Sequence, residues 1–443
     1  MSSIVPEAFT NPAYRARRQQ NWIVLGLLYA VFYMSRYNFA AVMADLSKTF
    51  SWSNTQLGVF ETMMPLVYGL SVVLNGPVAD RIGGKKAFLF GAAGVVVMNA
   101  LFGLCIYERE AFAPDHLLIV MAVIWGINGF FQSFGALSIV KVNAQWFHVR
   151  ERGTFAGIFG VLIRFGLILA FSGVPLIVSV LPLQYAFWVP GACVAVLFVL
   201  NYFLMQESPQ NAGFGDLDTG DGDGDGKPAP LAEVLRRVFA SRTTWAIALT
   251  SMMIGMVRRS TIDSWYPKYF KELYLPPTMK SVAAFTPYQT TVWGIALCGI
   301  AGGFAFGIAS DRFYGGRRAP VITFGFIGMI TMLLCFAALD HFHLGPWSAV
   351  VCLSLLSFFV NGAHGMVGGA ASMDFGGKKA AATAAGLFDG MQYLASSFVG
   401  LGMGFMLDHY GWRFWQFAPL PFAVIGALII SRLWNALPGK RAH

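Results

Sequence analysis

The chain has 443 residues, of which 56% are hydrophobic and only 12% are charged, and its formal net charge is +9. A soluble domain carries about 25% charged residues. The composition therefore excludes a water-soluble enzyme, a disordered chain and a nucleic-acid-binding module despite the basic charge, and it predicts an all-α membrane protein.

Twelve segments are apolar enough to span a bilayer, which takes about 20 residues each. They cover residues 22–44, 56–77, 87–106, 117–139, 153–175, 183–205, 243–268, 288–309, 319–338, 347–370, 380–405 and 412–435. The predicted organisation is a tail (1–21), a six-helix bundle (22–206), a polar linker (207–242), a second six-helix bundle (243–435) and a tail (436–443). Two bundles of six helices are typical of a transporter.

The basic residues predict the orientation of these helices. Most of the 31 Lys and Arg fall in the N-terminal tail, the even-numbered loops and the C-terminal tail. Cytoplasmic loops of membrane proteins are enriched in Lys and Arg. We therefore expect both termini to be cytoplasmic, and the basic charge to reflect topology rather than a polyanionic partner.

The two halves carry a similar motif after their second helix. Residues 76–86 read Gly-Pro-Val-Ala-Asp-Arg-Ile-Gly-Gly-Lys-Lys, and residues 307–318 read Gly-Ile-Ala-Ser-Asp-Arg-Phe-Tyr-Gly-Gly-Arg-Arg. We interpret Gly76, Asp80, Arg81, Asp311 and Arg312 as a conformational-switch motif, in which the glycine allows close packing and the acid meets a neighbouring helix N-terminus. Halves repeated in this way resemble those of the major facilitator superfamily, in which substrate binds between the halves.

Four arginines lie inside the apolar segments: Arg36, Arg164, Arg258 and Arg259. An arginine at the bilayer centre costs about 2.5–3.5 kcal/mol, so its presence indicates a polar cavity and an anionic partner. Arg36 in the first helix and Arg258 or Arg259 in the seventh are expected at similar depth. Their planar guanidinium groups match phosphate or carboxylate oxygens. Arg258 and Arg259 point about 100° apart, so we expect only one of them to face the cavity.

The alternative role for these arginines is an ion pair with a buried acid. Glu61, Asp263 and Asp389 are available in the second, seventh and eleventh helices. We expect pairing for whichever of Arg258 and Arg259 is turned away from the cavity. Arg164 fits a substrate contact and an ion pair equally well.

Several neutral polar residues lie at membrane depth and are candidates for contact with the organic part of a substrate. They are Tyr37, Asn128, Gln132, Trp265, Asn361, His364 and Gln392. Each could equally hydrogen-bond across helices, and His364 fits a packing role better. The sequence has no nucleophile–base spacing, phosphate-binding Gly-Lys-Ser/Thr loop or metal-ligand cluster, so we expect neither enzyme activity nor a cofactor or metal.

Five segments together resemble one branch of the superfamily, the organophosphate:phosphate antiporters, which contains glycerol-3-phosphate and hexose-phosphate exchangers and a hexose-phosphate sensor. These segments are residues 33–39, 128–135, 151–153, 263–267 and 378–386. The resemblance implies alternating access, with one arginine from the first helix and one from the seventh binding phosphate. Those roles fall on Arg36 and on either Arg258 or Arg259, with a slight preference for Arg259.

The chain departs from that family in the expected pocket. The family's lysine in the second helix is replaced by Val72, and its histidine in the fifth helix is absent. Arg164 lies beside that place and can restore positive charge. The expected anion site is therefore reshaped, which puts the classical specificity for glycerol 3-phosphate or glucose 6-phosphate in doubt.

The predicted function is exchange of an organic anion, expected to be an organophosphate, for inorganic phosphate by a monomer in the inner membrane with no nucleic-acid partner. One alternative is a sugar-phosphate sensor of the same fold. The other is a proton-coupled carboxylate symporter with Glu61 or Asp389 as the proton site.

Overall fold

The computed structural model describes residues 11–148, 151–215, 217, 219, 242–367 and 372–435, with backbone only for 152–159 and 372–387. All regular structure in these ranges is helical. Residues 1–10, most of the predicted linker and the tail 436–443 lie outside the described residues.

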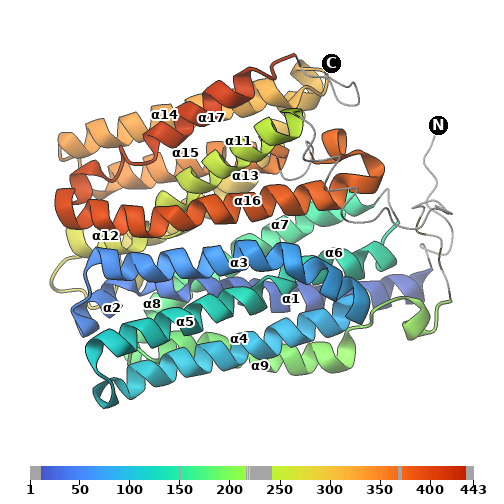
Figure 1. The fold of residues 1–443 in the computed structure, drawn as a ribbon, viewed down its shortest axis with the longest axis horizontal. Helices are drawn as coiled ribbons and strands as arrows, with labels where there is room; N and C mark the ends of the chain where they lie inside the picture. Colours follow the sequence, from blue (N-terminus) through green and yellow to red (C-terminus); the bar gives the residue numbers. More distant parts are fainter. Residues whose placement is uncertain are drawn as a thin grey trace.

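The first half of the chain folds into a bundle whose long helices run roughly along the longest axis of the molecule (Figure 1). Its elements are α1 (Pro12–Ala41), α2 (Met43–Phe50), α3 (Asn54–Ile82), α4 (Gly84–Tyr107), η2 (Arg109–Ala111), α5 (Pro114–Gln132), α6 (Phe134–Trp146), α7 (Arg152–Ile168), the π-helical η3 (Leu169–Gly173), α8 (Val174–Val180), α9 (Tyr185–Leu204) and η4 (Gln210–Ala212). The first, fourth and fifth passes are thus each built from consecutive helices.

The second half forms the other bundle. Its elements are α11 (Arg242–Ser260), α12 (Tyr266–Leu273), η5 (Val282–Ala284), α13 (Thr286–Phe313), α14 (Arg318–His341), α15 (Pro346–Gly365), α16 (Ser372–Tyr410), η7 (Trp412–Phe414) and α17 (Leu420–Ser431). Within the described ranges, nine helical segments have the length and apolar composition to cross a membrane. The passes that contain α11, α16 and α17 complete the predicted twelve, six in each half.

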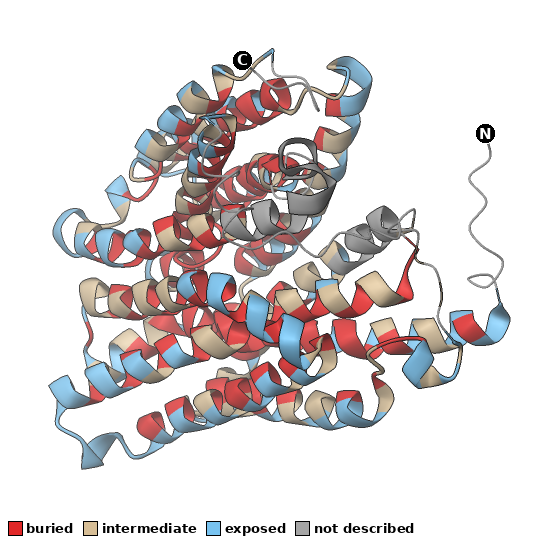
Figure 2. Ribbon diagram, turned by 45° about the vertical axis from the view of Figure 1, so that its right-hand side comes forward, coloured by how far each residue is buried: buried red, intermediate tan, exposed pale blue. Residues whose placement is uncertain are grey.

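The outer faces of both bundles are apolar, as expected for contact with lipid. Phe203, Phe313 and Phe398 are each about 70% exposed. Buried residues concentrate inside each bundle and between the two, whereas exposed residues lie on the outside and at the ends (Figure 2). The apolar outer surface distinguishes this chain from a soluble protein, in which large exposed apolar surfaces are rare.

The first helix begins earlier than predicted. Pro12 starts α1, and the side chain of Asn11 accepts a hydrogen bond from the amide of Ala13 at 2.9 Å. An Asn cap followed by Pro is a common helix start. Residues 12–21 of the predicted tail are therefore helical.

Helices α3 and α16 lie side by side along the boundary between the bundles (Figure 1). Glycines make this close approach possible. A Cβ atom on Gly58 would lie 2.4 Å from the carbonyl oxygen of Gly400, and one on Gly404 would lie 2.2 Å from that of Asn54. Any side chain at Gly58 or Gly404 would force the two bundles apart.

The two bundles are also joined at the end of the molecule opposite the termini. The carboxylate of Asp408 accepts hydrogen bonds from the amides of Asn54 and Thr55, at 2.8 and 2.7 Å. Lys271 of α12 pairs with Asp45 of α2. These contacts hold the start of α3 and the end of α16 together at this end.

The repeated motif packs differently from the prediction. Asp80 pairs with Lys141 at 3.1 Å, and the first amides of α4, those of Gly84 and Lys85, donate to Glu207 at 2.7 and 2.5 Å. In this conformation Glu207 therefore caps α4 and Asp80 pairs with Lys141 instead, so the contact of Asp80 with a neighbouring helix N-terminus stays a prediction.

In the second copy of the motif, Asp311 pairs with Arg318 at 2.6 Å. Arg81 and Arg312 are exposed. A Cβ atom on Gly76 would meet nothing within 4 Å. The close packing predicted at Gly76 is therefore not present in this conformation.

Candidate functional site

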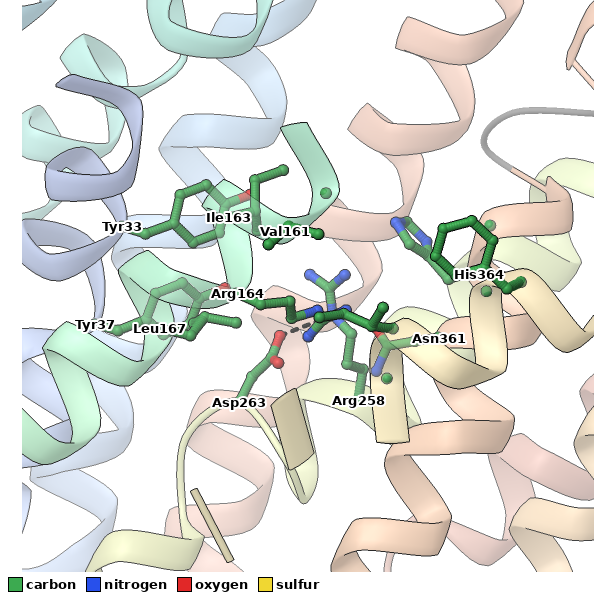
Figure 3. Close-up of a pocket in the computed structure, with 16 residues that line it drawn as sticks. Tyr33, Tyr37, Val161, Ile163, Arg164, Leu167, Arg258, Asp263, Asn361 and His364 are labelled. Carbon is green, nitrogen blue, oxygen red and sulfur yellow. Dashed lines mark hydrogen bonds and ion pairs between the residues drawn. The ribbon is translucent and has the colours of Figure 1, made fainter. Parts of the chain in front are cut away.

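A cavity of about 500 Å³ lies between the two bundles. Its walls come from α1 and α7 of the first half and from α11, α13 and α15 of the second (Figure 3). Seven polar side chains contribute to the lining: Tyr33, Tyr37, Arg164, Arg258, Asp263, Asn361 and His364. A cavity bounded by both halves is where a transporter with two repeated halves binds substrate.

Arg164 and Arg258 lie next to each other in this cavity (Figure 3). Nε of Arg258 is 2.7 Å from Oδ2 of Asp263, which we call the cavity ion pair. Arg164 donates from Nη2 to the side-chain oxygen of Asn361. Two guanidinium groups thus face one carboxylate in the described lining, so the cavity has an excess of positive charge.

Local backbone geometry positions the cavity ion pair. After α11 ends at Ser260, the amides of Ile262 and Asp263 both donate to the carbonyl of Arg258, each at 3.1 Å. This tight turn brings the Asp263 carboxylate back to the arginine. On the opposite wall, a Cβ atom at Gly299 would lie 3.3 Å from Cζ of Arg164, so a glycine makes room for the guanidinium.

Arg259 points away from the cavity. Its Nη2 lies 2.7 Å from Oε2 of Glu61 on α3, which we call the interface ion pair, and the hydroxyl of Ser264 also donates to Glu61. The side chains of Arg259 and Glu61 are only 8% and 2% exposed. The preference for Arg259 as the cavity arginine is therefore wrong, and the expectation that the arginine turned away is ion-paired is confirmed.

Arg36 is buried beside the cavity rather than in its lining. Its guanidinium carbon lies 4.7 Å from the ring centres of both Tyr33 and Tyr68. Its nitrogens contact Oε1 of Gln132 at 3.2 and 3.3 Å and the hydroxyl of Tyr393 at 3.3 Å. Among the described residues, no acid forms a salt bridge with Arg36.

Tyr33 lines the cavity, and its ring centre lies 4.7 Å from the guanidinium carbon of Arg36, which is not part of the described lining. The predicted opposition of Arg36 and a seventh-helix arginine across the cavity is therefore not present in this conformation. Arg164 of α7 faces Arg258 in its place.

The other candidates divide into two groups. Tyr37, Asn361 and His364 contribute to the cavity lining. The remaining five lie outside it: Asn128, Gln132, Trp265, Gln392 and Asp389.

The five residues outside the lining are buried or contact other residues of the protein. Asn128 accepts from Asn99 at 3.5 Å, Gln132 holds Arg36, and Gln392 accepts from Ser251 at 3.5 Å. Trp265 is fully buried, and Asp389 interacts electrostatically with Arg258 and Arg36. These five residues fit the structural alternative of contacts between helices.

Neither the apolar part of the lining nor Tyr33 was predicted as part of the wall, and Asp263 was expected only as a pairing acid. The unforeseen apolar lining consists of Gly160, Val161, Ile163, Leu167, Gly299, Ile300, Gly303, Phe304 and Gly365. The spacing of Gly299 and Gly303, four residues apart on α13, was the available signal, since both lie on one helix face.

Comparison with known proteins identifies the family to which this architecture belongs. The sequence profile of the Major Facilitator Superfamily matches residues 25–400. The glycerol-3-phosphate transporter of Bacillus subtilis (strain 168) is 27% identical, covering 97% of this chain and 95% of the relative. The membrane sensor protein UhpC of Salmonella typhimurium (strain LT2) is 25% identical, covering 97% and 94%.

Among solved structures, a bacterial homolog of the human lysosomal transporter Spinster, in an inward-facing and unoccupied conformation, superimposes with a TM-score of 0.73. It is 15% identical, and the match covers 95% of this chain and 97% of that one. These matches agree with the two six-helix bundles and confirm the resemblance found in the sequence. The chain belongs to the Major Facilitator Superfamily of membrane transporters.

Proposed function

We propose that the protein is a secondary active transporter that exchanges an organic phosphate for inorganic phosphate by alternating access. The observation that carries this proposal is the pair of arginines, Arg164 and Arg258, in a cavity between the bundles with Asp263 as the acid of its described lining. The similarity to a glycerol-3-phosphate transporter supports a phosphate-bearing substrate.

The two guanidinium groups have donors left for an anion. Asp263 lies against Nε of Arg258, and Asn361 accepts from Nη2 of Arg164. Each arginine has five N–H donors in a planar fork. The remaining donors can grip phosphate oxygens from two sides, while Asp263 and Asn361 hold the forks in position.

The driving force would be the opposing gradient of the exchanged anion. We place both termini in the cytoplasm, as the distribution of basic residues predicts. The contacts of Asp408 and Lys271 then close the external end, so that this conformation would receive substrate from the cytoplasm. The motifs around Asp80 and Asp311 would rearrange as the bundles rock.

Exchange of radiolabelled phosphate into proteoliposomes preloaded with phosphate tests the proposal. We expect wild-type protein to exchange and Arg164→Ala to lose at least about 90% of the rate, since a charge-assisted hydrogen bond contributes about 1.5–3 kcal/mol. Arg109→Ala, in the exposed η2 segment, is the matched control and should exchange normally. Absence of exchange by folded wild-type protein would contradict the proposal.

The similarity to a membrane sensor protein favours one alternative, a sensor that binds a sugar phosphate and signals without net transport. The same proteoliposomes separate the two functions. A sensor would bind the ligand, as seen by a thermal shift, yet would not exchange phosphate across the bilayer. Uptake that depends on a pH gradient would instead indicate a proton-coupled symporter.

A further inference from the structure

We infer that the organic part of the substrate is apolar, so that the transporter prefers alkyl or aryl phosphates over sugar and polyol phosphates. This inference rests on the proposed function, because it concerns what is attached to the phosphate held by Arg164 and Arg258. It goes further by naming the chemistry of the rest of the ligand.

The acid and the amide of the described lining are already paired with the two arginines, whose remaining N–H donors are left for the phosphate. Arg258 is paired with Asp263, and the Asn361 oxygen accepts from Arg164. The Asn361 nitrogen donates to the carbonyl and hydroxyl oxygens of Ser357, both at 2.9 Å. Asn361 therefore has little left to offer a hydroxyl of the substrate.

The remaining polar side chains of the described lining are Tyr33, Tyr37 and His364. Tyr33 and Tyr37 stack on each other with ring centres 5.8 Å apart, so they also present aromatic surface. A hexose phosphate carries several hydroxyls, each able to donate and accept. Three side chains, two of them from α1 and one from α15, cannot satisfy all of them.

The rest of the wall, as far as the structure describes its side chains, is hydrocarbon. Val161, Ile163 and Leu167 of α7 face the cavity, as do Ile300 and Phe304 of α13. Glycines such as Gly160 and Gly303 add open space without polar side chains, since a Cβ atom at either would meet nothing within 4 Å. Apolar substituents gain by leaving water for such a wall.

Substrate hydroxyls are disfavoured next to the same apolar wall. A hydroxyl that enters an apolar cavity without a partner forfeits its hydrogen bonds to water. The cavity of about 500 Å³ is large enough for either kind of ligand. Wall chemistry, rather than size, is therefore what separates them.

The test compares ligands that differ only in hydroxyl groups. n-Propyl phosphate is glycerol 3-phosphate without its two hydroxyls, and (tetrahydropyran-2-yl)methyl phosphate is glucose 6-phosphate without its four hydroxyls. Binding is read from the ligand-induced thermal shift of the purified protein, and phosphate exchange is measured in the same preparation. We expect the apolar member of each pair to bind at least tenfold more tightly.

A polar substitution in the wall should reduce that preference. Ile300→Asn adds an amide to the cavity and should lower the ratio of affinities at least threefold. Leu297→Asn is the matched control, because Leu297 is on the same helix, is 59% exposed and is not part of the lining. It should retain the wild-type ratio.

The outcomes distinguish the two proposals. Equal or tighter binding of glycerol 3-phosphate or glucose 6-phosphate overturns the inference while exchange of phosphate continues to support the proposed function. Preferential binding of the apolar esters without exchange supports the ligand class and contradicts the transport activity. Binding of none of the four esters overturns the inference.

Discussion

Arg258 and Arg259 are neighbours in the sequence, yet they lie in two different regions of the molecule. Arg258 lines the cavity and pairs with Asp263 from the turn that follows its own helix. Arg259 lies at the boundary between the bundles and pairs with Glu61 from the other half of the chain. The origin of the partner acid is what distinguishes the two regions.

An acid from the same half moves with its arginine when the bundles move. The cavity ion pair can therefore persist in every conformation and set the charge offered to a ligand. An acid from the opposite half must separate from its arginine if the bundles rock at that level. We therefore expect the interface ion pair to stabilise one conformation, and we expect Arg258, on the proposed function, to bind the anion.

The largest expected effect comes from breaking the interface ion pair. Glu61→Gln leaves the buried charge of Arg259 uncompensated, which should lower the free energy of unfolding by about 3–5 kcal/mol. Thermal unfolding in detergent measures the loss. The double variant Glu61→Leu/Arg259→Met removes both charges and should recover most of the stability. Unchanged stability of Glu61→Gln would show that the pair does not hold the bundles together.

A smaller effect is expected from replacing each arginine by lysine, because only the cavity arginine should need its planar guanidinium group to bind phosphate. Arg258→Lys keeps the charge but loses the fork, so phosphate affinity should fall roughly 10- to 100-fold, given about 1.5–3 kcal/mol for a charge-assisted hydrogen bond. Arg259→Lys is the matched control and should bind phosphate normally, because one nitrogen suffices to pair with Glu61. Equal losses in both variants would contradict the division between cavity and interface.

The smallest effect concerns Asp408, the exposed contact between the bundles, which lies beyond the predicted span 380–405. Burial raises the pKa of Asp408, but hydrogen bonds from the Thr55 side chain and from the amides of Thr55 and Asn54 outweigh it, so the pKa is lowered. Asp408→Ala should cost about 1 kcal/mol of stability at neutral pH, a value typical of a lost helix-terminus contact.

The lowered pKa gives this contact a defined pH dependence. Its contribution is complete above the carboxylate's unfolded pKa of about 3.9 and is lost as the pH falls through the folded value. The difference in thermal stability between wild type and Asp408→Ala should therefore shrink in acid. Glu110→Ala, at an exposed acid of η2, should match wild type. A difference that persists in strong acid would exclude the charged contact as its cause.

Much of the fold follows from the sequence because membrane spans are long and apolar. The twelve segments correspond to the helical passes of the structure, and the polar stretch after residue 206 marks the division into halves. The ends were less predictable. Residues 12–21 are polar, so hydropathy assigned them to a tail, although the Asn11 cap extends α1 through them.

The site was only partly predictable for a different reason. Burial of charge in a bilayer is expensive, so Arg36, Arg164, Arg258 and Arg259 were identifiable as functional candidates from their depth alone. Which of them face a common cavity depends on helix rotation and on neighbours far away in sequence. Tyr33, rather than the neighbouring Arg36, lines the cavity. The apolar side chains of α13 form a cavity wall only because α7 packs opposite them.

The sequence by itself determined the class of protein, the number of spans and the residue types of the proposed anion site, because these depend on local composition and on the cost of placing charge in lipid. Tertiary structure alone decided that Glu61 pairs with Arg259 and leaves Arg258 in the cavity. That choice depends on the packing of α3 against the second bundle, which joins residues about half a chain apart.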